Sequence, residues 1–148
     1  MTTKAYLEQA MYLDKTIDRK IREIESLRAL AQKTSGVLSN MPRSTSPDMQ
    51  PLETVTAKIV DLEMEVALDI DMLVDLKREL TDVINQVQNQ EYQNLLALRY
   101  LCGESWDRIA QDMGYCLRRI YQIHEDAIKS IVVTERLLTI SLNCTSIL

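Results

Sequence analysis

Two runs of apolar residues, repeating at alternating steps of three and four, constrain the fold of this 148-residue chain more than any other feature. The first run consists of Tyr6, Ala10, Leu13, Ile17, Lys20, Ile24, Leu27 and Ala31. The second consists of Leu52, Val55, Ile59, Leu62, Val66, Asp69, Leu73, Leu76, Leu80, Val83 and Val87. Such spacing predicts two helices that pack side by side along a shared apolar line, here called the seam.

The segment between the two runs, residues 35–51, has the composition of a loop, because it holds all three prolines, a glycine and five Ser or Thr residues. Thr34-Ser35-Gly36 is expected to end the first helix, and Pro51 suits the first turn of the second. A loop this short can only return the second helix antiparallel to the first. The sequence therefore predicts an antiparallel two-helix coiled-coil hairpin over residues 1–90.

Each run contains one charged exception, Lys20 in the first and Asp69 in the second. In an antiparallel hairpin, the numbers of facing residues sum to a rough constant, and these two fall within about one turn of each other. We predict that they meet and help to fix the register of the pairing. The alternative is that each side chain extends separately to solvent.

The second helix also carries a further apolar flank, formed by Leu68, Ile70, Met72 and Val74. A two-helix hairpin buries little surface by itself, so this flank predicts a partner. Homodimerisation through the hairpin is the first hypothesis. Binding to a different protein, such as RNA polymerase, is the alternative.

The segment from Ser105 to Ile131 has the spacing of a helix-turn-helix. Ala110 is small where two steeply crossing helices approach most closely, and Gly114 permits a sharp reversal between them. Ser105 stands at the N-cap position of the first helix. The predicted small core consists of Ile109, Met113, Ile120, Ile123 and Ala127, with Tyr115 over the turn. A supporting helix is expected from Glu91 to Leu101, presenting Leu95, Leu98 and Leu101 and ending at Gly103.

In a helix-turn-helix, the first turns of the second helix enter the major groove of DNA. Arginine can hold a guanine edge with two donors and glutamine can do the same for adenine, so Arg118, Arg119 and Gln122 are the predicted base contacts. Tyr121 and Lys129 are better placed for phosphates. The predicted DNA-facing set is Leu117, Arg118, Arg119, Tyr121, Gln122 and Lys129. The alternative is an ordinary solvated helix face.

The run from Gly114 to Ile123, followed by Ala127, Ile128 and Ile131, resembles the promoter-reading helix-turn-helix of region four in sigma-70 family factors. Lys4-Ala5-Tyr6-Leu7 and the motif led by Trp106 are similar to small phage and prophage proteins, among them late transcription regulators of the ArpU type. The resemblance implies a sigma-like DNA-binding domain over residues 91–148 that reads double-stranded DNA. Two positions depart from the pattern, since the family usually has a hydroxyl where this chain has Cys116 and a polar residue where it has Leu117.

The charge is unevenly distributed along the chain, whose net charge is −5. Residues 1–50 hold eight basic and six acidic residues, residues 51–90 hold three and nine, and residues 91–148 hold six and seven. Phosphate contacts contribute to affinity through counterion release, so a nearly neutral reading domain is predicted to bind DNA weakly alone. A second copy on the same site, or docking on RNA polymerase, would add affinity through effective concentration.

The sequence contains no glycine-rich phosphate loop, nucleophile elbow or metal-ligand cluster, so we expect neither enzymatic activity nor a cofactor or metal. The single histidine, His124, is expected to be partly buried and structural. Three cysteines without close pairing indicate neither a disulfide framework nor a zinc site. Cys102 and Cys116 are expected to be small buried residues.

No apolar run approaches the ~20 residues that a membrane span needs, and no signal peptide opens the chain, so a cytoplasmic location is expected. The apolar residues 132–148 are expected to extend the second domain by packing on the hairpin or on a partner. The combined prediction is an all-α phage-type transcription regulator that reads the major groove and assembles as a dimer through its hairpin. Two alternatives remain: a coiled-coil interaction or structural module without DNA binding, and a phage DNA-packaging subunit of small-terminase type.

Overall fold

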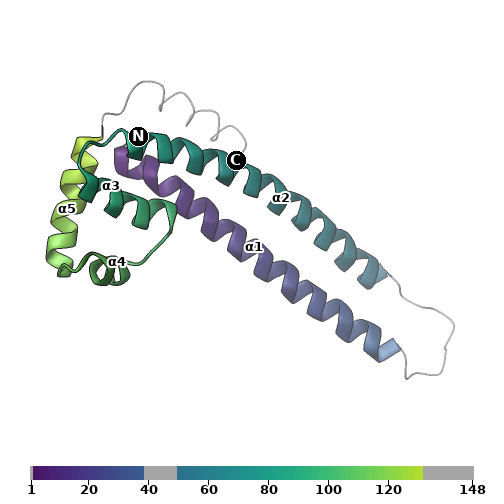
Figure 1. Ribbon diagram of the computed structural model, residues 1–148. Helices are drawn as coiled ribbons and strands as arrows, with labels where there is room; N and C mark the ends of the chain where they lie inside the picture. The colour runs from purple at the N-terminus through teal and green to yellow at the C-terminus, as the bar shows by residue number, and fades with distance from the viewer. Residues whose placement is uncertain (1, 39–49, 132–148) are drawn as a thin grey trace. The chain divides into compact units, whose positions relative to one another are not determined.

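The computed structural model describes residues 2–38 and 50–131, and these residues form helices with no β-strand among them (Figure 1). The elements are α1 (Thr3–Leu38), α2 (Gln50–Asn85), α3 (Gln90–Leu96), the π-helix η1 (Ala97–Leu101), α4 (Trp106–Met113) and α5 (Leu117–Ser130). The predicted all-α class is confirmed. The predicted conformation of residues 132–148 lies outside the described residues. None of the described helices is long and apolar enough to cross a membrane.

The chain divides into two compact units, one comprising residues 1–12 and 74–148 and the other residues 13–73. Both long helices contribute to both units. These units do not coincide with the predicted boundary after residue 90, which stays a prediction about where an independently folding domain begins.

In the unit of residues 13–73, α1 and α2 bury the predicted seam. The buried side chains are Ile17, Ile24, Leu62, Val66 and Leu73. The Lys20 Nζ atom lies 2.6 Å from Oδ2 of Asp69 and 3.2 Å from Oε2 of Glu65, so the predicted pairing of Lys20 with Asp69 is confirmed. The alternative, in which each side chain reaches solvent separately, is wrong.

Two further ion pairs give the direction of the helices in this unit. Lys58 of α2 pairs with Glu23 of α1 at 3.4 Å, and Arg28 of α1 pairs with Glu63 of α2. Together with Lys20 and Asp69, these contacts show that α1 and α2 run antiparallel here.

The predicted end of the first helix is wrong, because α1 continues through Gly36 to Leu38. A glycine inside a helix costs about 1 kcal/mol relative to alanine, which weakens a helix without terminating it. The second helix begins at Gln50 and has Pro51 in its first turn, as predicted.

In the unit of residues 1–12 and 74–148, the buried side chains of the two long helices are Tyr6, Leu7, Ala10, Leu80, Val83 and Ile84, and Val87 is buried just after α2 ends. A second cluster consists of Leu95, Ile109, Ala110, Ile120 and Ile123, with Tyr92, Leu98, Trp106 and Met113 packed against it. The predicted supporting helix is present as α3, whose N-cap Asn89 accepts from the backbone N–H of Glu91 at 2.9 Å. Its predicted last turn is the π-helix η1 instead, followed by Gly103 at φ 70°.

Candidate nucleic-acid interface

The turn between α4 and α5 is built as the spacing predicts. The Ser105 Oγ atom accepts from the backbone N–H of Arg108 at 3.3 Å and caps α4. Gly114 ends α4 at φ 71°, in the left-handed region that costs little without a Cβ, and its N–H donates to the Ala110 carbonyl. Only Tyr115 and Cys116 then separate Gly114 from α5, which begins at Leu117 as expected.

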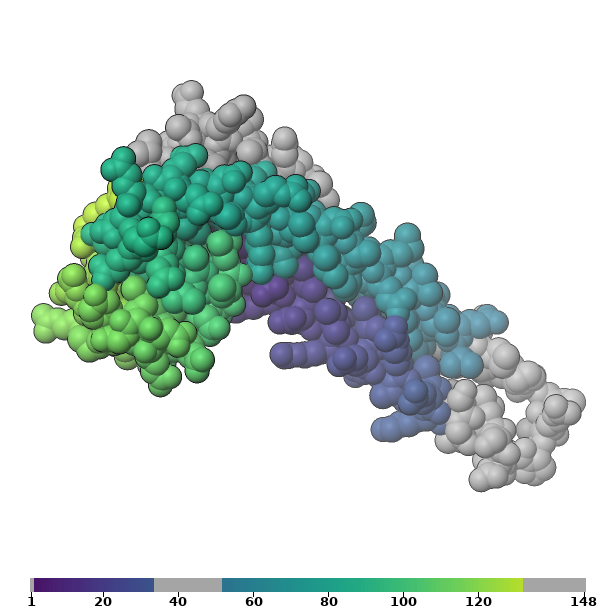
Figure 2. All heavy atoms as spheres, viewed as in Figure 1, coloured from purple at the N-terminus to yellow at the C-terminus, as the bar shows by residue number. Residues whose placement is uncertain are grey.

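One face of α5 is buried and the other carries the predicted DNA-facing residues. Ile120 and Ala127 are fully buried and Ile123 is 1% exposed. The predicted contacts are all exposed: Leu117, Arg118, Arg119, Tyr121, Gln122 and Lys129. Figure 2 shows α4 and α5, in green and yellow-green, at the molecular surface. Within the described part of the chain, Arg118, Arg119 and Lys129 form no ion pair, so these cations are available to a ligand.

The start of α5 has no side-chain cap. Cys116 occupies the N-cap position with extended backbone angles, and no side-chain hydrogen bond is made there. The backbone N–H groups of the first turn are therefore free for water or for an anionic group. The prediction that Cys102 and Cys116 are buried is wrong, since both are exposed. Cys102 follows the last turn of η1 and Cys116 precedes the first turn of α5, so neither cysteine lies on a packed helix face.

An aromatic cluster that the sequence analysis did not identify fixes α5 against α4 and η1. The Trp106 ring makes edge contacts with Tyr121, at 5.3 Å between centroids, and with His124, at 4.8 Å. The Arg99 guanidinium lies over the Trp106 ring, 4.3 Å from its centroid, and also donates to the Glu104 carbonyl at 2.9 Å. Trp106 thus positions the helix that carries the candidate DNA contacts. In the sequence, this cluster was indicated only by the i and i+3 spacing of Tyr121 and His124, which places both rings on one side of α5.

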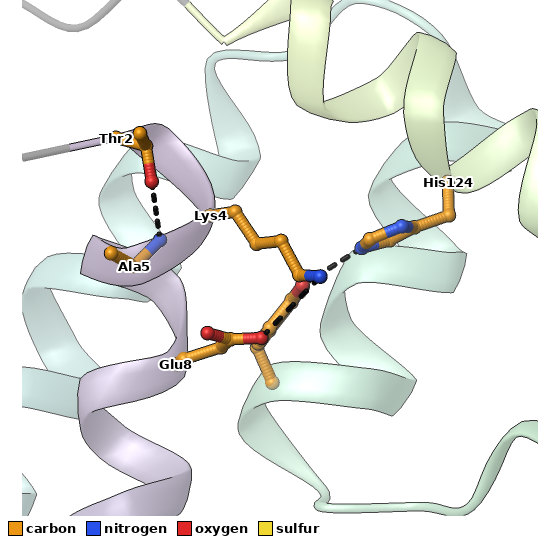
Figure 3. A network of polar contacts seen from close by, with 6 residues as sticks. Thr2, Lys4, Ala5, Glu8 and His124 are labelled. Atoms are coloured by element: carbon orange, nitrogen blue, oxygen red, sulfur yellow. Dashed lines mark hydrogen bonds and ion pairs between the residues drawn. The ribbon is translucent and has the colours of Figure 1, made fainter.

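His124 is buried, as predicted, and is joined to a second buried polar group. A hydrogen bond of 2.8 Å links its Nε2 atom to the Tyr100 hydroxyl. Burial lowers the pKa of His124, and the positive charges of Lys4 and Arg99 lower it further. Figure 3 shows the Lys4 side chain of α1 reaching toward the imidazole, and its Nζ atom pairs with Oε1 of Glu8 at 3.8 Å. Burial also raises the pKa of Tyr100 to about 12, so its hydroxyl stays protonated. The neutral pair is a structural contact.

This contact predicts a loss of stability in mild acid. Because folding lowers the pKa of His124, the unfolded chain binds a proton first as the pH falls below about 6.5, and stability falls with it by up to about 1.4 kcal/mol per pH unit. Glu79 acts in the opposite sense, since burial raises the pKa of its carboxyl. Thermal unfolding from pH 7.5 to 5 isolates the histidine when wild type is compared with His124→Gln. The variant should lose less stability on acidification; equal slopes would contradict the assignment.

The Tyr115 hydroxyl donates to Oε1 of Glu91 on α3 at 2.6 Å, a contact that the residue spacing did not predict. Both residues line a surface hollow of about 660 Å³. The other lining residues are Ile84, Asn85, Gln90, Gln93, Asn94, Ala97, Leu101, Asp112 and Met113. Amide and apolar side chains dominate this lining. No group of His, Cys, Asp or Glu residues within 2–38 and 50–131 has an arrangement that could hold a metal ion.

Comparisons with protein-family models, with curated proteins and with solved structures find no match for this chain. The resemblance to sigma region four and to ArpU-type regulators therefore stays an expectation, and function is argued from the chain's own residues.

Proposed function

We propose that this protein is a DNA-binding transcription regulator of phage type, in which α5 of a sigma-like helix-turn-helix domain enters the major groove. The observation that carries the proposal is the α4–α5 pair. A left-handed Gly114 reverses the chain, one face of α5 is buried, and Arg118, Arg119 and Gln122 stand exposed in its first two turns. This is the arrangement that base-edge recognition needs.

The other exposed residues of α5 fit supporting roles. Lys129 in the last turn is an exposed cation suited to a phosphate. Tyr121 is 47% exposed while its ring edge contacts Trp106, so its hydroxyl is held in a defined place for a phosphate oxygen. Leu117 is 38% exposed at the start of the helix and suits a thymine methyl group. No catalytic role is proposed for any of these residues.

The proposal includes assembly through an antiparallel coiled-coil hairpin formed by the two long helices. The apolar flank expected on α2 supports it in part, since Leu68 is 65%, Ile70 42% and Val74 51% exposed, whereas Met72 is half-buried. Val60 and Met64, 48% and 64% exposed, extend the flank toward the start of the helix. Val60, Met64 and Leu68 follow one another at steps of four and form one row of exposed apolar side chains, which favours a partner. A second copy would bring two reading helices to one DNA site. RNA polymerase is the alternative occupant, and a monomer at tens of micromolar in light scattering would exclude the dimer.

The test of DNA reading is selection of binding sites from a random duplex pool at low salt. Wild-type protein should enrich a short motif, repeated in two-fold or tandem arrangement if the protein binds as a dimer. The Arg118→Ala/Arg119→Ala variant is the matched control and should enrich nothing. A pool that wild-type protein leaves unenriched would contradict DNA reading and favour an interaction module that uses the exposed flank of α2.

A further inference from the structure

The outward face of α1 in the unit of residues 13–73 is strongly basic. Lys15, Arg19, Arg22 and Lys33 are all exposed and, at 100° per residue, lie within about 60° of arc on the helix. This basic stripe is opposite the seam, where Ile17 and Ile24 are buried. Side chains of α1, in purple and blue, project from the surface in Figure 2.

The basic stripe differs from the other cations of the same unit in having no partner. Lys20, Arg28 and Lys58 are each paired with a carboxylate on the other long helix. The four cations of the stripe form no ion pair among the described residues. Asp18 and Glu25 lie on one edge of the face and are exposed, so the face keeps an excess of positive charge.

The composition of the stripe favours a polyanion over a protein partner. Between Lys15 and Lys33 the face contains Ser26 and Ala29 besides its cations, and Leu30, 51% exposed at its edge, is its single large apolar side chain. Protein interfaces depend on buried apolar and aromatic anchors. By contrast, Lys15, Arg19 and Arg22 advance by about 6 and 4.5 Å along the helix axis, and long flexible side chains at that spacing can reach successive phosphates.

The part of the chain that carries the helix-turn-helix lacks an excess of positive charge. Residues 90–131 contain five Lys or Arg and six Asp or Glu, so little counterion release is available from them. We propose that the basic stripe of α1 is a second, sequence-independent DNA site that binds backbone phosphates and supplies affinity that α5 lacks. This inference rests on the proposed function for its choice of ligand.

The test compares two double variants of the full chain with equal loss of charge. Arg19→Gln/Arg22→Gln removes two cations of the stripe, and Lys77→Gln/Arg78→Gln removes two neighbouring cations of α2. Glutamine keeps helix propensity nearly unchanged in both. Binding to the selected duplex and to a scrambled duplex is measured by fluorescence anisotropy between 50 and 300 mM salt, with circular dichroism to check folding.

Each phosphate contact contributes about 0.9 to the slope of log affinity against log salt. The stripe variant should therefore lose about 2 from this slope and weaken on both duplexes by the same factor, with an unchanged preference for the selected one. The α2 variant should keep the wild-type slope.

Three results would overturn the inference. Equal slopes for wild type and the stripe variant would show no phosphate contact, and equal losses in both variants would show an effect of net charge alone. A stripe variant with wild-type DNA binding but an altered molecular mass in light scattering would assign the stripe to contact between copies. In each case a preference that depends on Arg118 and Arg119 leaves the proposed function standing, whereas wild-type protein that binds neither duplex at low salt contradicts the proposed function itself.

Discussion

Replacing Arg118 and Arg119 with alanine should reduce affinity for the selected duplex by at least about 30-fold. Each arginine that holds a guanine edge with two donors contributes about 1–3 kcal/mol of discrimination. Both side chains are exposed and lie outside the core cluster, so the variant should unfold at the wild-type temperature. Fluorescence anisotropy at fixed salt measures the loss on the selected duplex and on a scrambled one.

The same experiment separates base reading from general attraction to DNA. Lys129→Ala is the comparison, because a phosphate contact should weaken both duplexes equally. If Arg118→Ala/Arg119→Ala also weakened both duplexes equally, the two arginines would be phosphate contacts, and the proposed reading face would be wrong.

Replacing Lys20 with methionine should lower the free energy of unfolding by about 3 kcal/mol, the second large effect expected for this protein. The substitution leaves the Asp69 carboxylate inside the seam without its partner at 2.6 Å. Loss of one member of a buried pair costs about 3–5 kcal/mol, and the lower end applies because 17% of the Lys20 and 19% of the Asp69 side chain remain exposed. The double variant Lys20→Met/Asp69→Leu should regain wild-type stability or exceed it, since apolar residues can replace a buried pair without loss.

Lys58→Met is the matched control for the seam pair. Lys58 pairs with Glu23 across the same two helices, but the Lys58 side chain is 58% and the Glu23 side chain 40% exposed. Exposed pairs contribute only about 0–1 kcal/mol. Urea unfolding gives the midpoint and slope for each variant. Equal losses from Lys20→Met and Lys58→Met would show that Lys20 and Asp69 are an ordinary surface pair.

Most of the helical framework follows from residue spacing. Steps of three and four predicted which faces of α1 and α2 are buried, and two charged exceptions in those series were enough to predict that Lys20 meets Asp69. The turn at Gly114 was also predictable, because the left-handed conformation there requires a residue without a Cβ. These features depend on local conformation and on a periodic pattern, both of which a sequence displays directly.

Other features depend on three-dimensional packing and were not predictable. The π-helix η1 replaces the expected last turn of the supporting helix, and the contacts of Trp106 with Arg99 and His124 require knowing which faces of η1, α4 and α5 meet. The bond from Tyr115 to Glu91 likewise joins residues 24 positions apart. The spacing of the cations on α1 can be read from the sequence, but their availability to a ligand depends on their having no ion pair among the described residues, which only the structure shows.

The most direct test of the central claim replaces the guanines of the selected site with 7-deazaguanine, which removes the N7 acceptor from the major groove and leaves the minor groove unchanged. Affinities of wild type and Arg118→Ala/Arg119→Ala for both duplexes form a double-mutant cycle. If α5 reads guanine edges, wild-type affinity should fall about tenfold or more on the modified duplex, and the variant should be insensitive to the change. Equal losses for both proteins, or no loss for wild type, would contradict reading of the major groove by Arg118 and Arg119.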